Sequence, residues 1–164
     1  LMALGAVQAL GVDLAEAAPR LQQLRPVPGR MNPIDCQGGT LVDDTYNANP
    51  GSVRAAIDWL AGRPSPRTLV LGAMGELGPT ARTLVTELGA YARAAAIDAL
   101  ITLPGAEAAA EGFGDGAEPV ENFDQAAGKA AGTLAQGGTV LVKGSRSARM
   151  EQVVQRLTDK GRGH

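Results

Sequence analysis

From Met31 onward, short apolar runs alternate with longer amphipathic segments, and each run ends in a glycine-rich or polar turn. Four runs have the length of buried strands, at Gly39–Asp43, Thr68–Leu71, Ala99–Leu103 and Thr139–Lys143. Helical patterns occur at Ser52–Leu60, Ala81–Ala96, Ala106–Glu111, Phe123–Leu134 and Ala148–Thr158. Strands that alternate with helices indicate βαβ units. The sequence therefore predicts an α/β fold: a Rossmann-like, doubly wound, mostly parallel sheet of about six strands, with Met31–Cys36 as an extra strand, antiparallel at an edge.

The first 28 residues have a different character. Leu1–Leu10 is apolar on nearly every side, which is typical of a packed helix, and Asp13 with Glu16 has the spacing of a capping box that would open a second short helix. Arg25–Arg30 (RPVPGR) contains two prolines and a glycine, a composition that predicts a linker and a hinge. We expect residues 1–28 to be the tail of a preceding domain plus a linker, residues 29–164 to be the next domain, and the chain to be a piece of a longer polypeptide.

Composition excludes several classes of function. The net charge of −2 gives no electrostatic footprint for nucleic acid or for anionic membranes. No apolar run approaches the roughly 18–20 residues of a membrane span, and the first residues lack a signal-peptide layout, so we expect a cytoplasmic protein. Cys36 is the only cysteine and His164 the only histidine, which predicts neither a disulfide nor a metal site within the chain. We expect Cys36 to be an inert thiol because no basic cluster adjoins it.

Three polar loops directly follow predicted strands. They are DDTYNANP (43–50), GAMGELG (72–78) and KGSRS (143–147). The carboxyl ends of parallel strands meet at one edge of a sheet, where open α/β folds bind ligands. In the first loop, adjacent carboxylates can accept hydrogen bonds from ribose hydroxyls, and a phenol or an amide can pack against a base. The sequence therefore predicts a ligand site at this edge.

The other two loops give less specific signals. Lys143, Ser145 and Arg146, with the backbone N–H groups of a helix predicted to begin near Ser147, have the composition of an anion site. In the glycine-rich loop, Glu76 is the only charged residue. Neither the dinucleotide-binding G-x-G-x-x-G nor a P-loop occurs in the chain. Ordinary turns remain an alternative, since Ser52 is a good N-cap and Pro50 would stiffen the start of its helix.

Together the segments VPGRM, DDTYNANPGSVRAAIDWL, GAMGELG and VKGSRSARMEQVV resemble, in this order and spacing, the C-terminal domain of the bacterial Mur ligases. The resemblance covers almost the whole chain, with residues up to about Leu24 similar to the end of the family's central ATPase domain. Thr45 before Tyr46, and the Asn-Ala-Asn that follows, favour the members that add D-alanyl-D-alanine to UDP-N-acetylmuramoyl-tripeptide. Two positions depart from the family pattern, Ala73 at a commonly acidic position and Val85 at a common histidine.

The resemblance implies an ATP-dependent, amide-bond-forming ligase of peptidoglycan synthesis that acts through an acyl phosphate. It implies ATP binding by residues of the linker and of the first loop, namely Arg30, Asp44, Tyr46, Asn47 and Asn49. It implies D-alanyl-D-alanine binding by residues of the other two loops, namely Lys143, Ser145, Arg146 and Glu76. The phosphate loop and the Mg²⁺ ligands belong to the family's central domain, and the UDP-linked tripeptide binds mainly to the N-terminal domain. We therefore expect no catalytic residue in this chain, and no activity of the chain alone.

Two alternatives stay open at this point. One is another Mur ligase or a folylpolyglutamate-type ligase, which would add a different amino acid. The other is a Rossmann-like binding module without catalysis, which the missing P-loop would suit. A G-K-T/S phosphate loop upstream of Leu1 would leave only the ligases.

Overall fold

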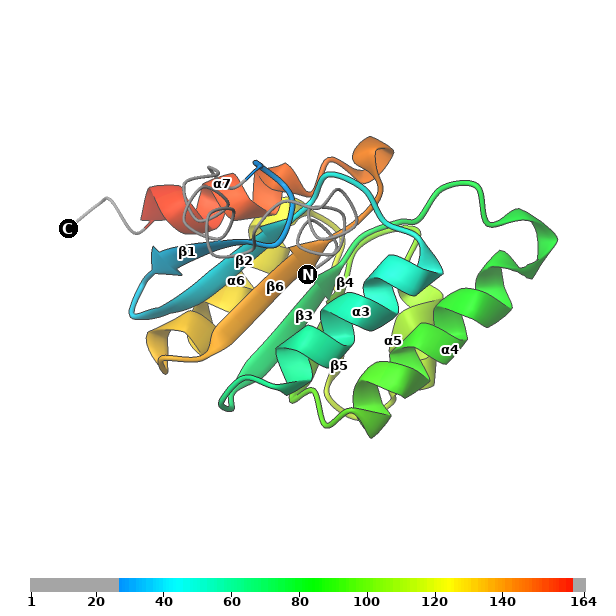
Figure 1. The fold of residues 1–164 in the computed structure, drawn as a ribbon, viewed down its shortest axis with the longest axis horizontal. Helices are drawn as coiled ribbons and strands as arrows, with labels where there is room; N and C mark the ends of the chain where they lie inside the picture. Colours follow the sequence, from blue (N-terminus) through cyan, green and yellow to red (C-terminus); the bar gives the residue numbers. More distant parts are fainter. Residues whose placement is uncertain (1–26, 161–164) are drawn as a thin grey trace, which may run out of the picture.

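Six strands form one sheet in the order β1-β2-β6-β3-β4-β5, and every neighbouring pair except β1 and β2 is parallel. The computed structural model describes residues 27–160 (Figure 1). The strands are β1 (Asn32–Cys36), β2 (Gly39–Asp44), β3 (Arg67–Leu71), β4 (Ala99–Thr102), β5 (Ala117–Pro119) and β6 (Thr139–Lys143). The predicted α/β fold with a mostly parallel sheet is thus confirmed, and the run near Met31 is the antiparallel edge strand that the sequence predicted.

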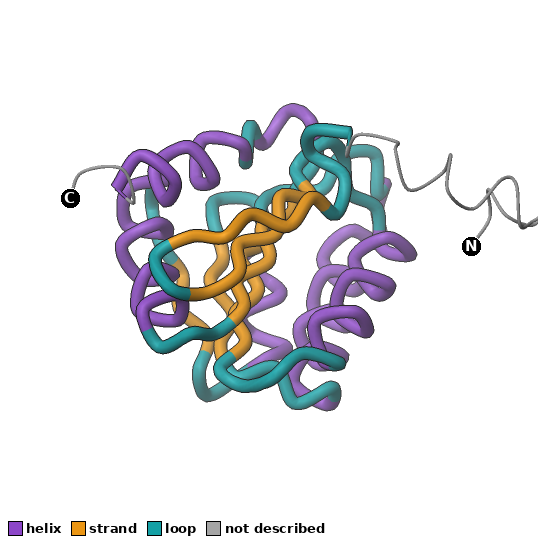
Figure 2. The backbone as a smooth tube through the Cα atoms, turned by 60° about the vertical axis from the view of Figure 1, so that its left-hand side comes forward, coloured by secondary structure: helices purple, strands orange, loops and turns teal. Residues whose placement is uncertain are grey.

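Helices cover both faces of the sheet. The α-helices are α3 (Pro50–Ala61), α4 (Ala81–Ala94), α5 (Glu107–Phe113), α6 (Phe123–Ala135) and α7 (Glu151–Lys160), and the 3₁₀ turns are η1 (Gly78–Thr80) and η2 (Arg146–Ala148). Helices α3, α4 and α5 lie on one face and α6 and α7 on the other, so the strands run between two helical layers (Figure 2). The two helices predicted before residue 27, and most of the predicted segment 1–28, lie outside the described residues.

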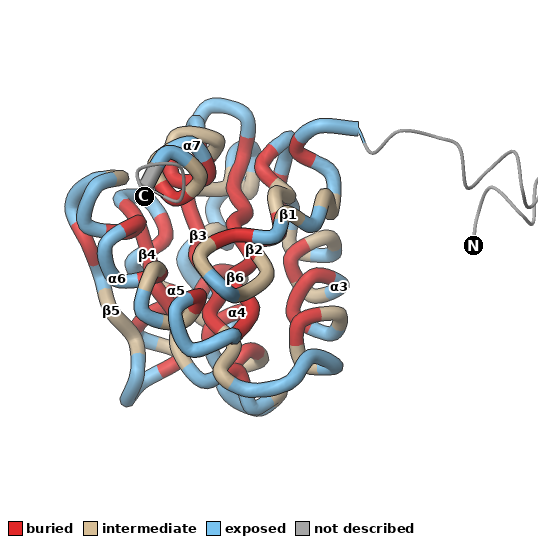
Figure 3. Tube along the Cα trace, turned by 90° about the vertical axis from the view of Figure 1, so that its left-hand side faces the viewer, coloured by how far each residue is buried: buried red, intermediate tan, exposed pale blue. Residues whose placement is uncertain are grey.

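Alternating side chains of the central strands build two cores. Leu69 and Leu71 of β3 and Leu141 of β6 face α3, α4 and α5, whereas Val70 and Val142 face α6 and α7. Both faces are buried, which explains why these strands read as continuous apolar runs rather than as alternating patterns. Figure 3 shows this buried interior as red segments inside a largely exposed surface.

The helix after β6 begins later than the sequence predicted. We expected a helix from near Ser147 or Ala148, but the chain makes the 3₁₀ turn η2, passes through Arg149 with φ 49°, and enters α7 only at Glu151. The left-handed Arg149 turns the chain so that the Met150 side chain is fully buried over the sheet end. A Cβ on Gly72 would lie 2.4 Å from the Met150 sulfur, so a larger residue there would force the Met150 side chain to move.

An ion pair holds the amino ends of β3 and β4 together. Asp98 accepts hydrogen bonds from the backbone N–H of Arg67 at 2.7 Å and from its Nε at 3.1 Å. Burial alone would raise the pKa of Asp98, but the hydrogen bonds from Arg67 and Ser65 outweigh it, and the pKa lies below its usual range. The charged form of Asp98 is therefore the form that stabilises the fold.

We expect Asp98→Asn to lower the free energy of unfolding by about 1 kcal/mol at pH 7, because the pair is partly exposed. A depressed folded-state pKa contributes stability above the unfolded pKa of about 3.9, and this contribution is lost as the pH falls through the folded value. The difference between wild type and variant should therefore begin to shrink near pH 4 and decrease further toward pH 2.5 in urea unfolding curves measured from pH 7 to pH 2.5. Asp115→Asn, at an exposed loop carboxylate, is the control, and a difference that persists in acid would contradict the prediction.

Candidate nucleotide and dipeptide site

Two hollows lie at the carboxyl edge of the sheet around the end of β6. Strands β2 and β3 leave this edge toward the α3 and α4 layer, whereas β6 leaves toward α7 on the opposite face. Such a switch point is where open α/β sheets bind ligands. The first hollow, about 560 Å³, is lined by Gly29, Arg30, Met31, Asp44, Tyr46, Asn47, Asn49, Ser52, Ala55, Ala56, Trp59 and Lys143. The second, about 590 Å³, is lined by Asn47, Ala48, Asn49, Pro50, Gly75, Glu76, Leu77, Ser145, Arg146 and Ser147.

The linker segment, residues 27–31, is fixed to the end of β2 and to the loop that follows it by three hydrogen bonds of its backbone. The N–H of Gly29 donates to Asp43 at 3.0 Å, and the N–H of Met31 donates to Asp44 at 3.2 Å. The N–H of Tyr46 donates to the Gly29 carbonyl at 2.9 Å. Gly29 has φ +75° and would place a Cβ 3.0 Å from the Tyr46 nitrogen, so only glycine permits this close approach. As a result Arg30 is held at the rim of the first hollow.

The two adjacent carboxylates have different surroundings. Asp43 accepts hydrogen bonds from the Thr45 hydroxyl at 2.6 Å and the Thr45 N–H at 3.3 Å, in addition to the one from Gly29. Its oxygens therefore serve the loop and the linker segment. Of the two, only Asp44 lines a hollow. The crowding of polar groups in DDTYNANP thus has a structural part, at Asp43 and Thr45, and a part that faces the cavity.

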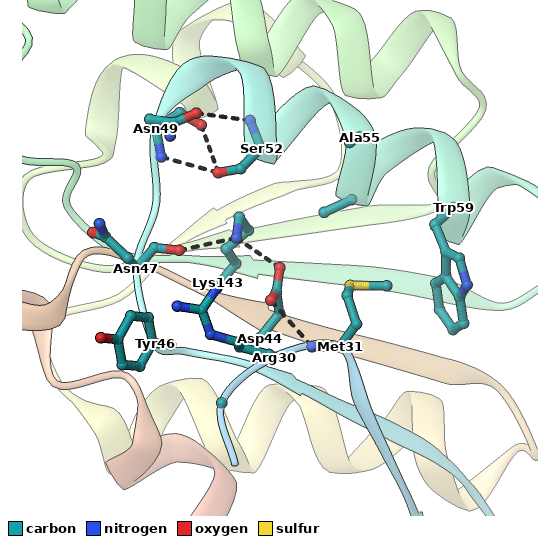
Figure 4. A pocket seen from close by; sticks show the side chains of 12 residues that line it. Arg30, Met31, Asp44, Tyr46, Asn47, Asn49, Ser52, Ala55, Trp59 and Lys143 are labelled. Atoms are coloured by element: carbon teal, nitrogen blue, oxygen red, sulfur yellow. Dashed lines mark hydrogen bonds and ion pairs between the residues drawn. The ribbon is translucent and has the colours of Figure 1, made fainter. Parts of the chain in front are cut away.

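Lys143 lies in the first hollow and not with Ser145 and Arg146, where the sequence grouped it. Its ammonium donates to Asp44 at 2.6 Å and to the Asn47 carbonyl at 3.0 Å (Figure 4). The register explains this position, because Asp44 pairs with Lys143 at the ends of the parallel strands β2 and β6, so both side chains leave the same face of the sheet. Lys143 is only 2% exposed, so these two acceptors take the place of water around its ammonium group.

An arginine stacked on a tyrosine forms one wall of the first hollow. The Arg30 guanidinium lies 4.1 Å from the centroid of the Tyr46 ring, and that ring is 47% exposed (Figure 4). A cation over an aromatic face gains about 0.5–1 kcal/mol at an exposed site, which is enough to favour this arrangement. The wall therefore presents a cation and an exposed aromatic surface to the cavity.

Helix α3 supplies the opposite, mostly apolar wall, which the sequence analysis did not assign to the site. Ser52, Ala55, Ala56 and Trp59 all line the hollow, and their spacing of three to four residues places them on one helix face. The helical spacing of these four residues is a signal by which they could have been predicted, because the helix was expected to begin at the ligand-binding edge of the sheet. Trp59 is half-buried, packs against the core and also lines the cavity.

The N-cap of α3 is Asn49 and not Ser52, which corrects the sequence prediction. The Asn49 side chain accepts from the Ser52 N–H at 2.8 Å, and the Ser52 hydroxyl accepts from the Asn49 N–H at 3.0 Å. This reciprocal pair is a capping box, with Pro50 at the first helical position where its missing N–H has no cost. The Asn49 side-chain oxygen is therefore occupied by the helix, which leaves its NH₂ group as the part that can bind a ligand.

The second hollow collects residues from three loops. Glu76, Ser145 and Arg146 all line it, as the sequence analysis grouped them. The turn after β6 is joined to the loop after β3 because the Ser145 N–H donates to the Ala73 carbonyl at 2.8 Å. Ser147 also lines this hollow, and its hydroxyl lies 3.0 Å from that of Ser145. The hollow thus offers a guanidinium, a carboxylate and two hydroxyls.

Three further observations concern other kinds of site. Burial raises the pKa of the Cys36 thiol, against a smaller lowering by Gln37, which agrees with the expected unreactive cysteine. Within residues 27–160, no three His, Cys, Asp or Glu side chains gather closely enough to hold a metal ion. In the same part of the chain, no helix has the length and apolar character needed to cross a membrane.

A doubly wound sheet with a polar cleft at the carboxyl end of β6 is the arrangement that the sequence predicted for a ligand-binding α/β domain. Residues 29–146 match the family described as Mur ligase, glutamate ligase domain, and the chain belongs to this family.

The chain is 37% identical over 160 residues to the UDP-N-acetylmuramoyl-tripeptide–D-alanyl-D-alanine ligase of Escherichia coli, a match that covers 93% of this chain and 34% of the relative. It superposes on the MurF ligase of Thermotoga maritima, solved in complex with ADP, with a TM-score of 0.81 and 30% identity, covering 96% of this chain and 36% of that one. A folylpolyglutamate synthase of Mycobacterium tuberculosis superposes with a TM-score of 0.58 and 19% identity over 80% of this chain and 32% of that one, and shares the fold alone. The chain thus spans about a third of the length of its relatives.

Proposed function

We propose that this domain supplies one wall of the ATP site, and part of the dipeptide site, of a ligase that adds D-alanyl-D-alanine to UDP-N-acetylmuramoyl-tripeptide. The observation that carries the proposal is the first hollow, which brings Arg30, Asp44, Tyr46, Asn47 and Asn49 to one cavity. The similarity to a MurF ligase solved in complex with ADP supports an adenine nucleotide as its ligand. The 37% identity to the UDP-N-acetylmuramoyl-tripeptide–D-alanyl-D-alanine ligase of Escherichia coli supports this pair of substrates.

The residues of the first hollow suit an adenine nucleotide. Asp44 uses its two oxygens for Met31 and Lys143, and a carboxylate offers about four acceptor positions, so it can still accept from ribose hydroxyls. The exposed Tyr46 ring and the apolar face of α3 offer surfaces for a base. The Arg30 guanidinium suits phosphate oxygens or the ribose. When bound, ATP supplies the phosphoryl group that activates the tripeptide carboxylate, while these side chains bind and orient the nucleotide.

The second hollow suits a dipeptide zwitterion. The Arg146 guanidinium matches a carboxylate, Glu76 matches an ammonium group, and the hydroxyl of Ser145 can bind either the peptide carbonyl or the carboxylate. Asn47 and Asn49 line both hollows, which would place the dipeptide beside the nucleotide. Lys143 faces the first hollow, so we do not assign it to the dipeptide.

The remaining groups of the reaction are proposed to come from other parts of the same protein. Phosphoryl transfer depends on positioning and on charge stabilisation, which P-loops and Mg²⁺ commonly provide, and this chain contains no P-loop. The relatives are about three times as long as the matched region, which leaves room for further domains. We propose that those domains hold Mg²⁺, the phosphates and the UDP-linked tripeptide, and that the RPVPGR stretch (Arg25–Arg30) contains the hinge between them and this domain. The cytoplasmic location stays a prediction.

The test is ATP-dependent ligation by the full-length protein that carries this domain. We expect Arg30→Ala to lower kcat/KM for ATP by about 100-fold, because a charge-assisted contact of about 1.5–3 kcal/mol is lost. The 164-residue chain alone should be inactive. Arg93→Ala is the matched control, since Arg93 also stacks on a ring, that of Phe113, but lies at the end of α4 away from both hollows. Full activity of the isolated chain, or ATP kinetics unchanged in Arg30→Ala, would contradict the proposal.

A further inference from the structure

The buried ammonium of Lys143 is the feature of the cleft that the proposed function leaves without a role. Removing a charge from water is costly unless it is paired and hydrogen-bonded. Lys143 is 2% exposed and the Asp44 side chain 13%, so both members of the pair are shielded from solvent. Apolar residues of the same volume often stabilise a fold as well as a buried ion pair does. Stability alone therefore does not explain this pair, and we looked for a role in ligand binding.

The two acceptors of Lys143 are the parts of the loop that face a ligand. Asp44 is the carboxylate of the first hollow, and the carbonyl of Asn47 belongs to a residue that lines both hollows. The remaining Asp44 oxygen is held by the Met31 N–H of the linker segment. One ammonium therefore fixes the direction of the carboxylate and the path of the chain between the two cavities.

We propose that Lys143 is a positioning residue, which orients Asp44 and the Asn47 backbone before the nucleotide binds. This inference rests on the proposed function, because it assigns the residue a role in the same nucleotide site. A carboxylate held in one direction loses less conformational freedom when it receives a ligand, so binding is stronger than to a mobile carboxylate. Lys143 acts through Asp44, and its contribution to affinity exists only while that carboxylate is present.

The test is a double-mutant cycle on ADP affinity, measured by titration calorimetry on the full-length protein. We expect Lys143→Met to weaken ADP binding about tenfold, which is within the range of coupling between contacting residues. Asp44→Asn should weaken it to a similar or greater extent. Adding Lys143→Met to Asp44→Asn should then change the dissociation constant less than about twofold, because the group that Lys143 positions is already lost.

The outcomes separate this role from its alternatives. If the effects multiply to about 100-fold, Lys143 contacts the nucleotide directly and the inference is wrong. If Lys143→Met leaves ADP affinity unchanged and raises only the KM for D-alanyl-D-alanine, the residue belongs to the dipeptide site and the inference is equally wrong. If the unmodified full-length protein does not bind ADP, the proposed function fails together with it.

The inference can still be tested if the Lys143→Met variant does not fold. The double variant replaces both charges with neutral side chains, so it leaves no unpaired ion in the interior. The comparison of Asp44→Asn with Asp44→Asn/Lys143→Met still tests for a direct contact when Lys143→Met alone is unfolded, because a further tenfold loss of ADP affinity in the double variant would overturn the inference. Circular dichroism of each variant checks that the calorimetry is performed on folded protein.

Discussion

Gly89→Ala is expected to destabilise the domain by about 3 kcal/mol or more, because the added methyl group would overlap the backbone of a neighbouring helix. Gly89 of α4 lies against α5, and an added Cβ would stand 1.8 Å from the Ala109 carbonyl oxygen. The contact is reciprocal, since a Cβ on Gly112 of α5 would stand 1.9 Å from the Thr86 carbonyl oxygen. Both obstacles are backbone atoms, so neither can be relieved by a side-chain rotation.

The measurement is urea unfolding of the chain followed by circular dichroism. The matched control is Gly128→Ala in α6, where an added Cβ meets no atom within 4 Å and the position is exposed. That control should gain up to about 1 kcal/mol from the higher helix propensity of alanine. If Gly89→Ala behaved like Gly128→Ala, the close crossing of α4 and α5 would not exist in solution.

Asp44→Ala is expected to cost about 3–5 kcal/mol, because it leaves the Lys143 ammonium buried without its counter-ion. The control is Glu118→Ala, which breaks a pair of the same kind with Lys129 on the surface, where both side chains are more than 40% exposed. That change should cost less than about 1 kcal/mol.

Urea unfolding of the same chain measures both variants. The double replacement Asp44→Leu/Lys143→Met should recover most of the loss, since apolar residues of similar volume replace buried pairs at little cost. An equal, small loss for Asp44→Ala and Glu118→Ala would mean that water reaches Lys143, contrary to the burial described above.

Much of the fold was readable from local patterns because its central strands are short, have apolar middles and are bounded by glycine or polar turns. Thr139–Lys143 was predicted with its observed bounds for this reason. Strand β5 was missed because Ala117–Pro119 is three residues long and has no apolar run. The start of α7 was wrong because Arg149 adopts a left-handed conformation that its sequence does not announce.

The loops that form the candidate site could be predicted from the sequence, but the contacts between their side chains could not. Asp44 and Tyr46 stand out because their polar loop directly follows a predicted strand, whereas Arg30 was assigned to the site through the resemblance to the Mur ligases. The partner of Lys143 could not be found this way, since Asp44 is 99 residues away and only the register of β2 with β6 brings them together. Asp43 and Asp44 also have different roles, because Asp43 binds the linker segment and Thr45 whereas Asp44 lines the first hollow. No sequence periodicity predicts where the linker segment lies, so this difference could not be predicted.

The place of β6 in the sheet has a consequence for biosynthesis. β2 and β3 are made long before β6, yet they do not pair with each other, because the last strand lies between them. A growing chain therefore leaves the ribosome with two unpaired strand edges, and it must keep them apart until residues 139–143 have been translated. A chain truncated before residue 139 lacks β6 and Lys143. Such a chain can neither join β2 to β3 in one sheet nor form the first hollow as described.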